Sequence, residues 1–517
     1  MDVWPPHAMK RALGLSLASA LLLGCTVGKN FVPPNPQAPE RWPERALSVP
    51  EAAPPLPGGA PSAAVAIATD EGDVQLAWWQ GFQDPTLTRL IERGRDSNLD
   101  VRVALLRVLE ARAQREVTAA QYWPNLSLDA SFSRERLSQS TPTGALIGNV
   151  GNIRVPGFPA INIPNPYNQY QLSADASWEL DLFGRVRRQV EAADANVKVS
   201  VEDQHAILEA ALADIAQNYI ELRGAQARQR VARDNLTTID ELLQLTQQRN
   251  DAGLTTYIDV SNAAAQAEVT RAELPVIELQ ITQSMNQLSH LLGREPEALR
   301  AELTIDTPMP PLPSAVPVGL PAQLARRRPD IREAEASLHA ATAQQGVAVA
   351  DLFPRLTLSA GGGFQSETAG QLLDWASRFG SFGPALELPV FDRGRWKSLR
   401  LYDVRAQEAA LSYQSTVLQA LHEVDNATTA LATDQQRRAW LVASVADNRD
   451  ALRLSRQRYE SGLTNFIDVL DAERTLQQNQ LSLVDSVTAV GTDLVRLYRA
   501  LGGGWQVGPE AAAAPGP

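Results

Sequence analysis

The feature that most constrains the fold is an internal repeat covering most of the chain. The segment Leu99-Asp100-Val101-Arg102 returns 230 residues later as Pro329-Asp330-Ile331-Arg332. Further along, Gly253-Leu254-Thr255-Thr256-Tyr257-Ile258-Asp259-Val260 returns 209 residues later as Gly462-Leu463-Thr464-Asn465-Phe466-Ile467-Asp468-Val469. Matches that keep their order along the chain indicate two copies of one structural unit.

The repeat sets the expected boundaries of the chain's parts. We expect a first repeat at residues 76–293 and a second at 323–502, joined by a Pro-rich linker at 294–322. An extended segment at 25–75 precedes them, and a flexible tail at 503–517 follows. The offset decreases from 230 residues at the first match to 209 at the second, because the first copy has about 22 additional residues. These residues lie in a Gly-, Pro- and Asn-rich loop at 134–168.

Each repeat contains two segments in which apolar and polar residues alternate, a pattern typical of strands with one apolar face. They are Leu126–Phe132 and Tyr170–Leu182 in the first copy, and Leu356–Ala360 and Phe382–Val390 in the second. Polar positions such as Asp175, Glu179 and Asp181 favour a water-filled lumen over a soluble sandwich.

Four strands cannot close a barrel, and an open sheet edge is not stable in lipid because its backbone groups find no hydrogen-bond partners there. If the strands cross a membrane, the chain must therefore oligomerise. Two copies would supply eight strands and three copies twelve, and the residues alone permit both.

Two segments without an internal proline, 184–252 and 392–461, predict very long helices. At 1.5 Å per residue, each could span on the order of 100 Å. The helices that follow them carry apolar residues every seventh position, which predicts a coiled-coil seam: Val260, Ala267, Leu274, Ile281, Leu288 and Val469, Leu476, Leu483, Val490, Leu497. Gly253 and Gly462 are expected at the tips of the helix hairpins, and Pro275 interrupts only the first copy.

Composition and motifs exclude several function classes. A formal net charge of -12 disfavours a nucleic-acid partner, since such a partner requires clustered Lys and Arg. No phosphate-binding loop, nucleophile elbow or metal-ligand spacing is present, so we expect no catalytic residue, no metal and no enzyme activity.

The N-terminus has the layout of a secretory signal. Lys10 and Arg11 precede the apolar run Ala12–Leu23, which predicts a signal peptide at 1–24, with either Met1 or Met9 as the start. The segment Leu22-Leu23-Gly24-Cys25 resembles the bacterial lipobox, and Cys25 is the single cysteine of the chain. The resemblance implies a covalent lipid on Cys25, with no other cofactor.

Three groups of residues together resemble a known family. They are Cys25-Thr26-Val27-Gly28-Lys29-Asn30-Phe31, the two strand pairs, and the stretch from Tyr459-Glu460-Ser461-Gly462 to Asp468-Val469-Leu470-Asp471-Ala472. Over the whole mature chain they resemble the TolC and OprM class of outer-membrane efflux factors, and within it the lipoproteins that serve resistance-nodulation-division pumps.

The resemblance implies a mixed α and β membrane protein. Its expected form is a homotrimer, in which a trimeric 12-stranded β-barrel with four strands per chain stands on a long α-helical coiled-coil periplasmic tunnel. The expected partners are outer-membrane lipid, a periplasmic adaptor and an inner-membrane pump. The expected function is passive conduction of drugs or other small molecules across the outer membrane, with type I protein secretion as the alternative.

The resemblance also assigns a periplasmic gate to Asp468, Asp471 and Tyr459. Some members carry a gate arginine where this chain has Thr464, so one salt bridge of those members is not expected. Asp468 and Asp471 are three residues apart and share a helix face, which predicts a cation-favouring constriction. The alternative is that both aspartates only stabilise a helix N-terminus.

Overall fold

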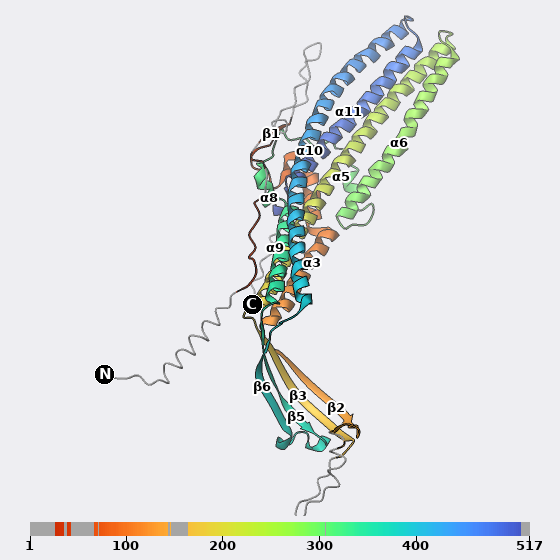
Figure 1. The fold of residues 1–517 in the computed structure, drawn as a ribbon. Helices are drawn as coiled ribbons and strands as arrows, with labels where there is room; N and C mark the ends of the chain where they lie inside the picture. Colours follow the sequence, from red (N-terminus) through yellow and green to blue (C-terminus); the bar gives the residue numbers. More distant parts are fainter. Residues whose placement is uncertain are drawn as a thin grey trace, which may run out of the picture. The chain divides into compact units, whose positions relative to one another are not determined.

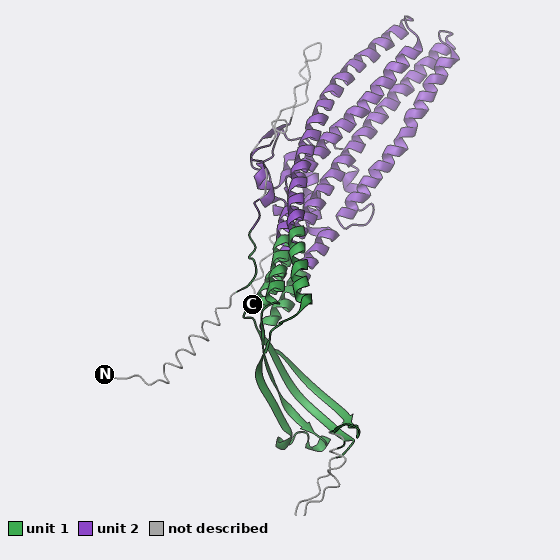
Figure 2. Ribbon diagram, viewed as in Figure 1, with its two compact units in different colours: residues 1–32, 111–197, 337–409 green, residues 33–110, 198–336, 410–517 purple. Residues whose placement is uncertain are grey.

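The computed structural model describes residues 26–35, 39–42, 67–70, 72–142, 145, 164–305 and 307–507. The chain divides into two compact units (Figure 2). Unit 1 comprises residues 1–32, 111–197 and 337–409, and unit 2 comprises 33–110, 198–336 and 410–517. The predicted signal peptide and Cys25 lie outside the described residues, as does most of the predicted extended segment.

Unit 1 contains one antiparallel sheet in the order β2-β3-β5-β6 (Figure 1). Its strands are β2 (Asn125–Glu135), β3 (Tyr167–Leu180), β5 (Arg355–Ser366) and β6 (Arg378–Glu387). All four alternating segments of the sequence are therefore confirmed as strands.

The strand register collects the predicted apolar residues on one face of the sheet. Leu126 lies opposite Ala176, Ala176 opposite Ala360, and Ala360 opposite Phe382, which makes an apolar row across all four strands. No described residue covers this face, since Leu128 is 78% and Phe382 74% exposed. The outer edges of β2 and β6 have no neighbouring strand among the described residues.

Two strands end earlier than the alternation predicted. Because β3 ends at Leu180 and β6 at Glu387, the predicted strand positions Asp181, Leu182, Leu388 and Val390 lie beyond them. The carboxylate of Asp181 accepts hydrogen bonds from the backbone N–H groups of Val186 (3.1 Å) and Arg187 (2.9 Å) at the start of the following helix. Asp181 was predicted to face a lumen, but it caps a helix, because an aspartate satisfies the free N–H groups of a first turn.

The long helices are confirmed as α5 (Arg185–Asp251) and α10 (Arg393–Glu460). Each is followed by a shorter antiparallel partner, α6 (Tyr257–Leu291) and α11 (Phe466–Ala500) (Figure 1). Every residue of the predicted heptad seams is at least partly buried, and α6 continues through Pro275. None of the helices in the described part of the chain combines the length and the hydropathy of a membrane span.

The remaining helices and strands are shorter than those of the hairpins. The carboxylate of Asp84 caps α2 (Pro85–Ser97) by accepting from the N–H of Thr86. The helices α3 (Leu99–Ala119) and α9 (Pro329–Ala350) precede the two strand pairs. A parallel pair of β1 (Ala68–Asp70) and β4 (Ala315–Pro317) was not predicted. Short helices complete the fold: η2 (Trp78–Phe82), η3 (Ala120–Tyr122), α7 (Arg300–Leu303), η4 (Pro321–Gln323), α8 (Leu324–Arg327), η5 (Ala369–Gln371), η6 (Trp375–Ser377) and η7 (Trp505–Val507).

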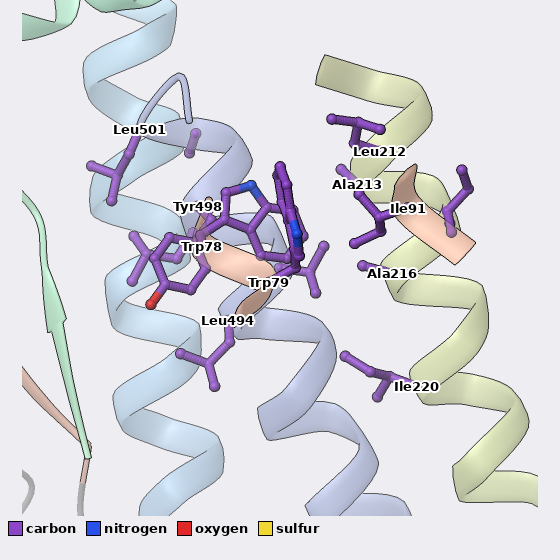
Figure 3. Packing of buried hydrophobic residues seen from close by; sticks show 14 of the residues in the cluster. Trp78, Trp79, Ile91, Leu212, Ala213, Ala216, Ile220, Leu494, Tyr498 and Leu501 are labelled. Atoms are coloured by element: carbon purple, nitrogen blue, oxygen red, sulfur yellow. The ribbon is translucent and has the colours of Figure 1, made fainter. Parts of the chain in front are cut away.

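The core of unit 2 is centred on Trp78, which is 1% exposed (Figure 3). Its ring stacks on Tyr498 with the centroids 5.3 Å apart and meets Trp79 edge-on at 5.7 Å. Its Nε1 donates a hydrogen bond to the carbonyl of Gly503 (3.3 Å), and Trp505 stacks on His205. The first residues of the predicted C-terminal tail are therefore packed against unit 2.

Candidate functional site

The two hairpin tips of unit 2 have nearly the same backbone geometry. Gly253 and Gly462 have φ angles of +70° and +71°, in the left-handed region that favours glycine. The N–H of the next residue bonds back to the helix: Leu254 to the carbonyl of Arg249 and Leu463 to that of Arg458, both at 2.8 Å. These bonds end α5 and α10 sharply, so each predicted tip glycine lies at a helix reversal.

Tyr459, at the end of α10, joins the two hairpins. Its side chain is buried at 4% exposure and meets Phe466 of α11 edge-on, with the centroids 5.7 Å apart. The guanidinium of Arg249, at the end of α5, lies 4.6 Å from the centre of the Tyr459 ring. Arg249 also donates a hydrogen bond to the carbonyl of Glu460 (3.2 Å). A cation over an aromatic face at this distance is attractive, so Tyr459 holds the hairpins together near their tips.

Asp468 and Asp471 lie on α11 and are both exposed. The hydroxyl of Thr464 donates a hydrogen bond to the carboxylate of Asp468 in the first turn of the helix. In the first copy, the hydroxyl of Thr255 donates to Asp259 in the same way. Asp468 therefore has a local structural role, whereas no hydrogen-bond donor in the described residues engages the carboxylate of Asp471.

A third acid on α11, Glu473, was not identified from the sequence. It is 1% exposed, and burial raises its pKa, although Nε2 of Gln477 donates a hydrogen bond to it (3.1 Å). The sequence contained a signal for it: Glu473 lies seven residues after Phe466, in the stripe that also buries Val469 and Leu470.

The match to a known protein family also divides this chain into two halves, as the internal repeat does. The family model described as outer membrane efflux protein matches residues 90–294 and 320–503. The chain belongs to the outer membrane efflux protein family. Outer membrane protein OprJ of Pseudomonas aeruginosa is 34% identical over 84% of this chain and 87% of its own length.

Two further comparisons agree. The probable efflux pump outer membrane protein TtgC of Pseudomonas putida is 31% identical over 96% of both chains. The solved structure of the outer-membrane channel OprN superposes with a TM-score of 0.80 at 34% identity, covering 93% of this chain and all of that one. The predicted family and the outer-membrane localisation are confirmed.

The described residues contain no arrangement that points to metal chemistry. No group of three or more His, Cys, Asp or Glu side chains in them is placed to hold a metal ion. The conspicuous features are instead an uncovered apolar sheet face and two helix hairpins, which suit a membrane channel.

Proposed function

We propose that this chain is the outer-membrane exit of a tripartite efflux system and passively conducts drugs or other small molecules released by an inner-membrane pump. One observation carries the proposal: the four-stranded sheet has an exposed apolar face and two edges that pair with no strand in the described part of the chain. Membership in the efflux family and the name of TtgC support an efflux role over type I protein secretion.

Closure of the barrel requires more than one copy. In lipid, the unpaired backbone groups of β2 and β6 must find partners on another chain. We assign β6 of one copy to β2 of the next and three copies to the ring, which gives twelve strands on a tunnel built from the long helices. The two matches of the family model and the recurring order of helices and strands support a duplicated unit.

The lipid-facing assignment is tested with a matched pair on β2. Leu128 lies on the apolar face, and Asp129 occupies the next position, on the opposite face. A basic residue at mid-membrane on the lipid face costs about 2–4 kcal/mol, whereas lumen positions tolerate exchange. We expect Leu128→Arg to abolish heat-resistant oligomers in outer membranes, and Asp129→Arg to assemble with altered ion selectivity in planar bilayers. Equal assembly of both variants would contradict the assignment.

The number of copies is tested by oxidative cross-linking between the open edges. Ser131→Cys on β2 is combined in turn with Phe379→Cys, Ser381→Cys and Gly383→Cys on β6. A covalent band of three chains is expected from the pair in register. A band that stops at two chains would favour an eight-stranded barrel, and a water-soluble monomer would refute the membrane assignment.

We also propose that Cys25 carries the covalent lipid. The residues directly after it are held against unit 1: the N–H of Val27 donates to the carbonyl of Phe183 (3.1 Å), and Arg188 donates to Asn30 (2.7 Å). The chain that follows an anchor at Cys25 is thus fixed at Val27, beside Phe183 and just beyond the end of β3. Metabolic labelling with palmitate is expected to mark the wild type and not Cys25→Ser; label in both would place the lipid elsewhere.

For the periplasmic gate, we propose that Asp468, Asp471 and Tyr459 form the closing ring together with their copies. The exposed carboxylates and the Arg249–Tyr459 contact between hairpins support this. Three chains would gather six carboxylates near one axis and attract cations. We expect Asp468→Ala with Asp471→Ala to reduce cation selectivity and raise conductance, while Asp259→Ala in the first copy changes neither. Unchanged selectivity and closure in the double variant would leave Asp468 only its local structural role, as the acceptor of the hydrogen bond from Thr464.

The partners follow from the same proposal: a periplasmic adaptor and a pump, which we expect to be of the resistance-nodulation-division type. Co-purification from cells expressing the neighbouring pump and adaptor genes tests this. Recovery of an ATP-driven secretion transporter instead would favour the alternative function.

A further inference from the structure

Unit 2 contains a cavity of about 550 Å³ between α5, the start of α9, α10 and α11. Part of its wall is made of small apolar residues, which leave the space open: Ala206, Pro329, Ala427, Ala430 and Ala500. A volume of this size is typical of sites for small organic molecules. The rest of the wall carries four carboxyl groups, three guanidinium groups and the amide of Asn426.

One of these carboxyl groups has no partner. Glu209 of α5 lines the cavity and is only 8% exposed. Within the described chain, no donor forms a hydrogen bond or an ion pair with its carboxyl. Burial raises its pKa to about 8. A buried ionisable group without a partner is costly, so its presence in a cavity wall needs an explanation.

The most buried cation of the wall is already neutralised. Arg328 is 7% exposed, and one of its nitrogens lies 2.7 Å from Asp330 and 2.6 Å from Glu423. Its remaining terminal nitrogen donates to the carbonyl of Ala500 (2.9 Å). With two carboxylates around one guanidinium, Arg328 leaves no positive charge for an anionic ligand.

The other two cations are paired and reach into solvent. Arg496 lies 3.1 Å from Asp493, and Arg499 lies 3.9 Å from Asp214; both arginine side chains are more than half exposed. Burial and the neighbouring carboxyl of Asp434 raise the pKa of Asp493 to about 6. The cavity wall itself carries four carboxyl groups against three guanidinium groups, so one negative charge is in excess when all four carboxyl groups are ionised.

We propose that this cavity binds a small organic cation, a primary ammonium ion on a short hydrocarbon chain, with the carboxylate of Glu209 as its counter-ion. The ammonium donates hydrogen bonds to the carboxylate, and the hydrocarbon contacts the alanine-lined wall. Binding at this site is a function separate from conduction. The cavity lies within unit 2, and binding there requires neither the gate residues nor an inner-membrane pump.

Binding displaces a proton. In the empty cavity at neutral pH, the Glu209 carboxyl is mostly protonated, and the entering cation takes the proton's place while the proton leaves to solvent. Arg328 and Arg499 favour the ionised form, whereas Asp330 and Glu423 oppose it. With a pKa of about 8, affinity for the cation should fall about tenfold from pH 9 to pH 7.

The test is titration calorimetry on the full-length lipidated protein in detergent, with n-butylammonium chloride as the probe and 1-butanol as its uncharged counterpart. We expect saturable binding of the amine, about tenfold tighter at pH 9 than at pH 7, with proton release seen as a dependence of the heat on the buffer. Equal affinity for 1-butanol, or no dependence on pH, would overturn the proposal.

Three variants locate the site. Glu209→Gln keeps the shape and removes the charge, and should weaken binding of the amine at least tenfold at pH 9. Ala430→Leu takes up space in the cavity while the Glu209 carboxyl is kept, and should also weaken binding of the amine. Glu241→Gln, an exposed glutamate on the same helix, should bind as the wild type does. Wild-type affinity in Glu209→Gln would place the cation elsewhere and refute the assignment.

Discussion

Replacing Glu209 by glutamine should change how the stability of the protein depends on pH. In the unfolded chain, a glutamate loses its proton near pH 4.5, whereas burial holds the proton on folded Glu209 up to a pKa of about 8. Between these values the unfolded state binds fewer protons than the folded state, so the stability of the wild type falls as pH rises. Glutamine does not titrate, so Glu209→Gln does not lose stability in this way as pH rises.

The magnitude follows from the two pKa values. A rise from 4.5 to about 8 corresponds to at most ~5 kcal/mol between the two ends of this range. Water in the cavity reduces the penalty, so we expect a gain for Glu209→Gln of roughly 2–5 kcal/mol above pH 8 and almost none at pH 4.5. For a chain of this length, unfolding in one step, that gain is roughly 2–5 °C in the melting temperature.

The assay is thermal unfolding followed by intrinsic fluorescence, at matched scan rates from pH 4.5 to pH 9, with Glu241→Gln as the control. The melting-temperature difference between Glu209→Gln and the wild type should rise through this range and level off above pH 8. The control difference should stay flat. A constant difference for Glu209→Gln, or one that shrinks toward high pH, would show that the carboxyl is ionised throughout and refute the reasoning.

Three further predictions concern the core, the sheet and the hairpin tip. Trp78→Ala should destabilise unit 2 by about 3–5 kcal/mol in denaturant unfolding, and Trp78→Phe by less than half of that, because Phe keeps the ring contact with Tyr498. Gly363→Val should abolish heat-resistant oligomers on gels, because a Cβ there would lie 2.0 Å from the carbonyl oxygen of Leu172; Gly383→Val, with nothing within 4 Å of its Cβ, should assemble. Gly462→Ala should cost about 1–2 kcal/mol of local stability, because alanine resists the left-handed φ of +71°, and should speed amide hydrogen exchange at the tip without blocking assembly.

The parts of the fold that could be predicted are those encoded in local periodicity. Alternation over Tyr170–Leu180 predicted a strand, and a proline-free stretch predicted the helix α5. Each of these patterns lies within a single element. Because the repeat supplied two examples of each, a weak pattern in one copy was supported by the other. Gly253 and Gly462 followed from the same logic, since two glycines at equivalent positions both took a positive φ.

What could not be predicted depends on partners distant in sequence. The strands β1 and β4 are three residues each, pair across almost 250 positions, and are too short to show alternation. The end of β3 was misplaced because Asp181 continues the alternating pattern, although its side chain is engaged by the backbone of α5. Alternation alone does not distinguish a lumen-facing carboxylate from a helix cap.

Two of the buried glutamates, Glu209 and Glu473, show that the same limit applies to predicting functional sites. Glu473 lies in an apolar stripe of its own helix, and Nε2 of Gln477, one turn away, donates a hydrogen bond to it. Its environment is therefore largely local and could be inferred from spacing. Glu209 is buried by α9, α10 and α11 and has no such donor, so no pattern within α5 distinguishes it from a surface acid such as Glu241. The difference has a functional consequence: Glu473 is 1% exposed on a helix face that also buries Val469 and Leu470, whereas Glu209 lines a cavity of about 550 Å³. Glu209 therefore has room beside its carboxyl for a ligand that supplies a positive charge.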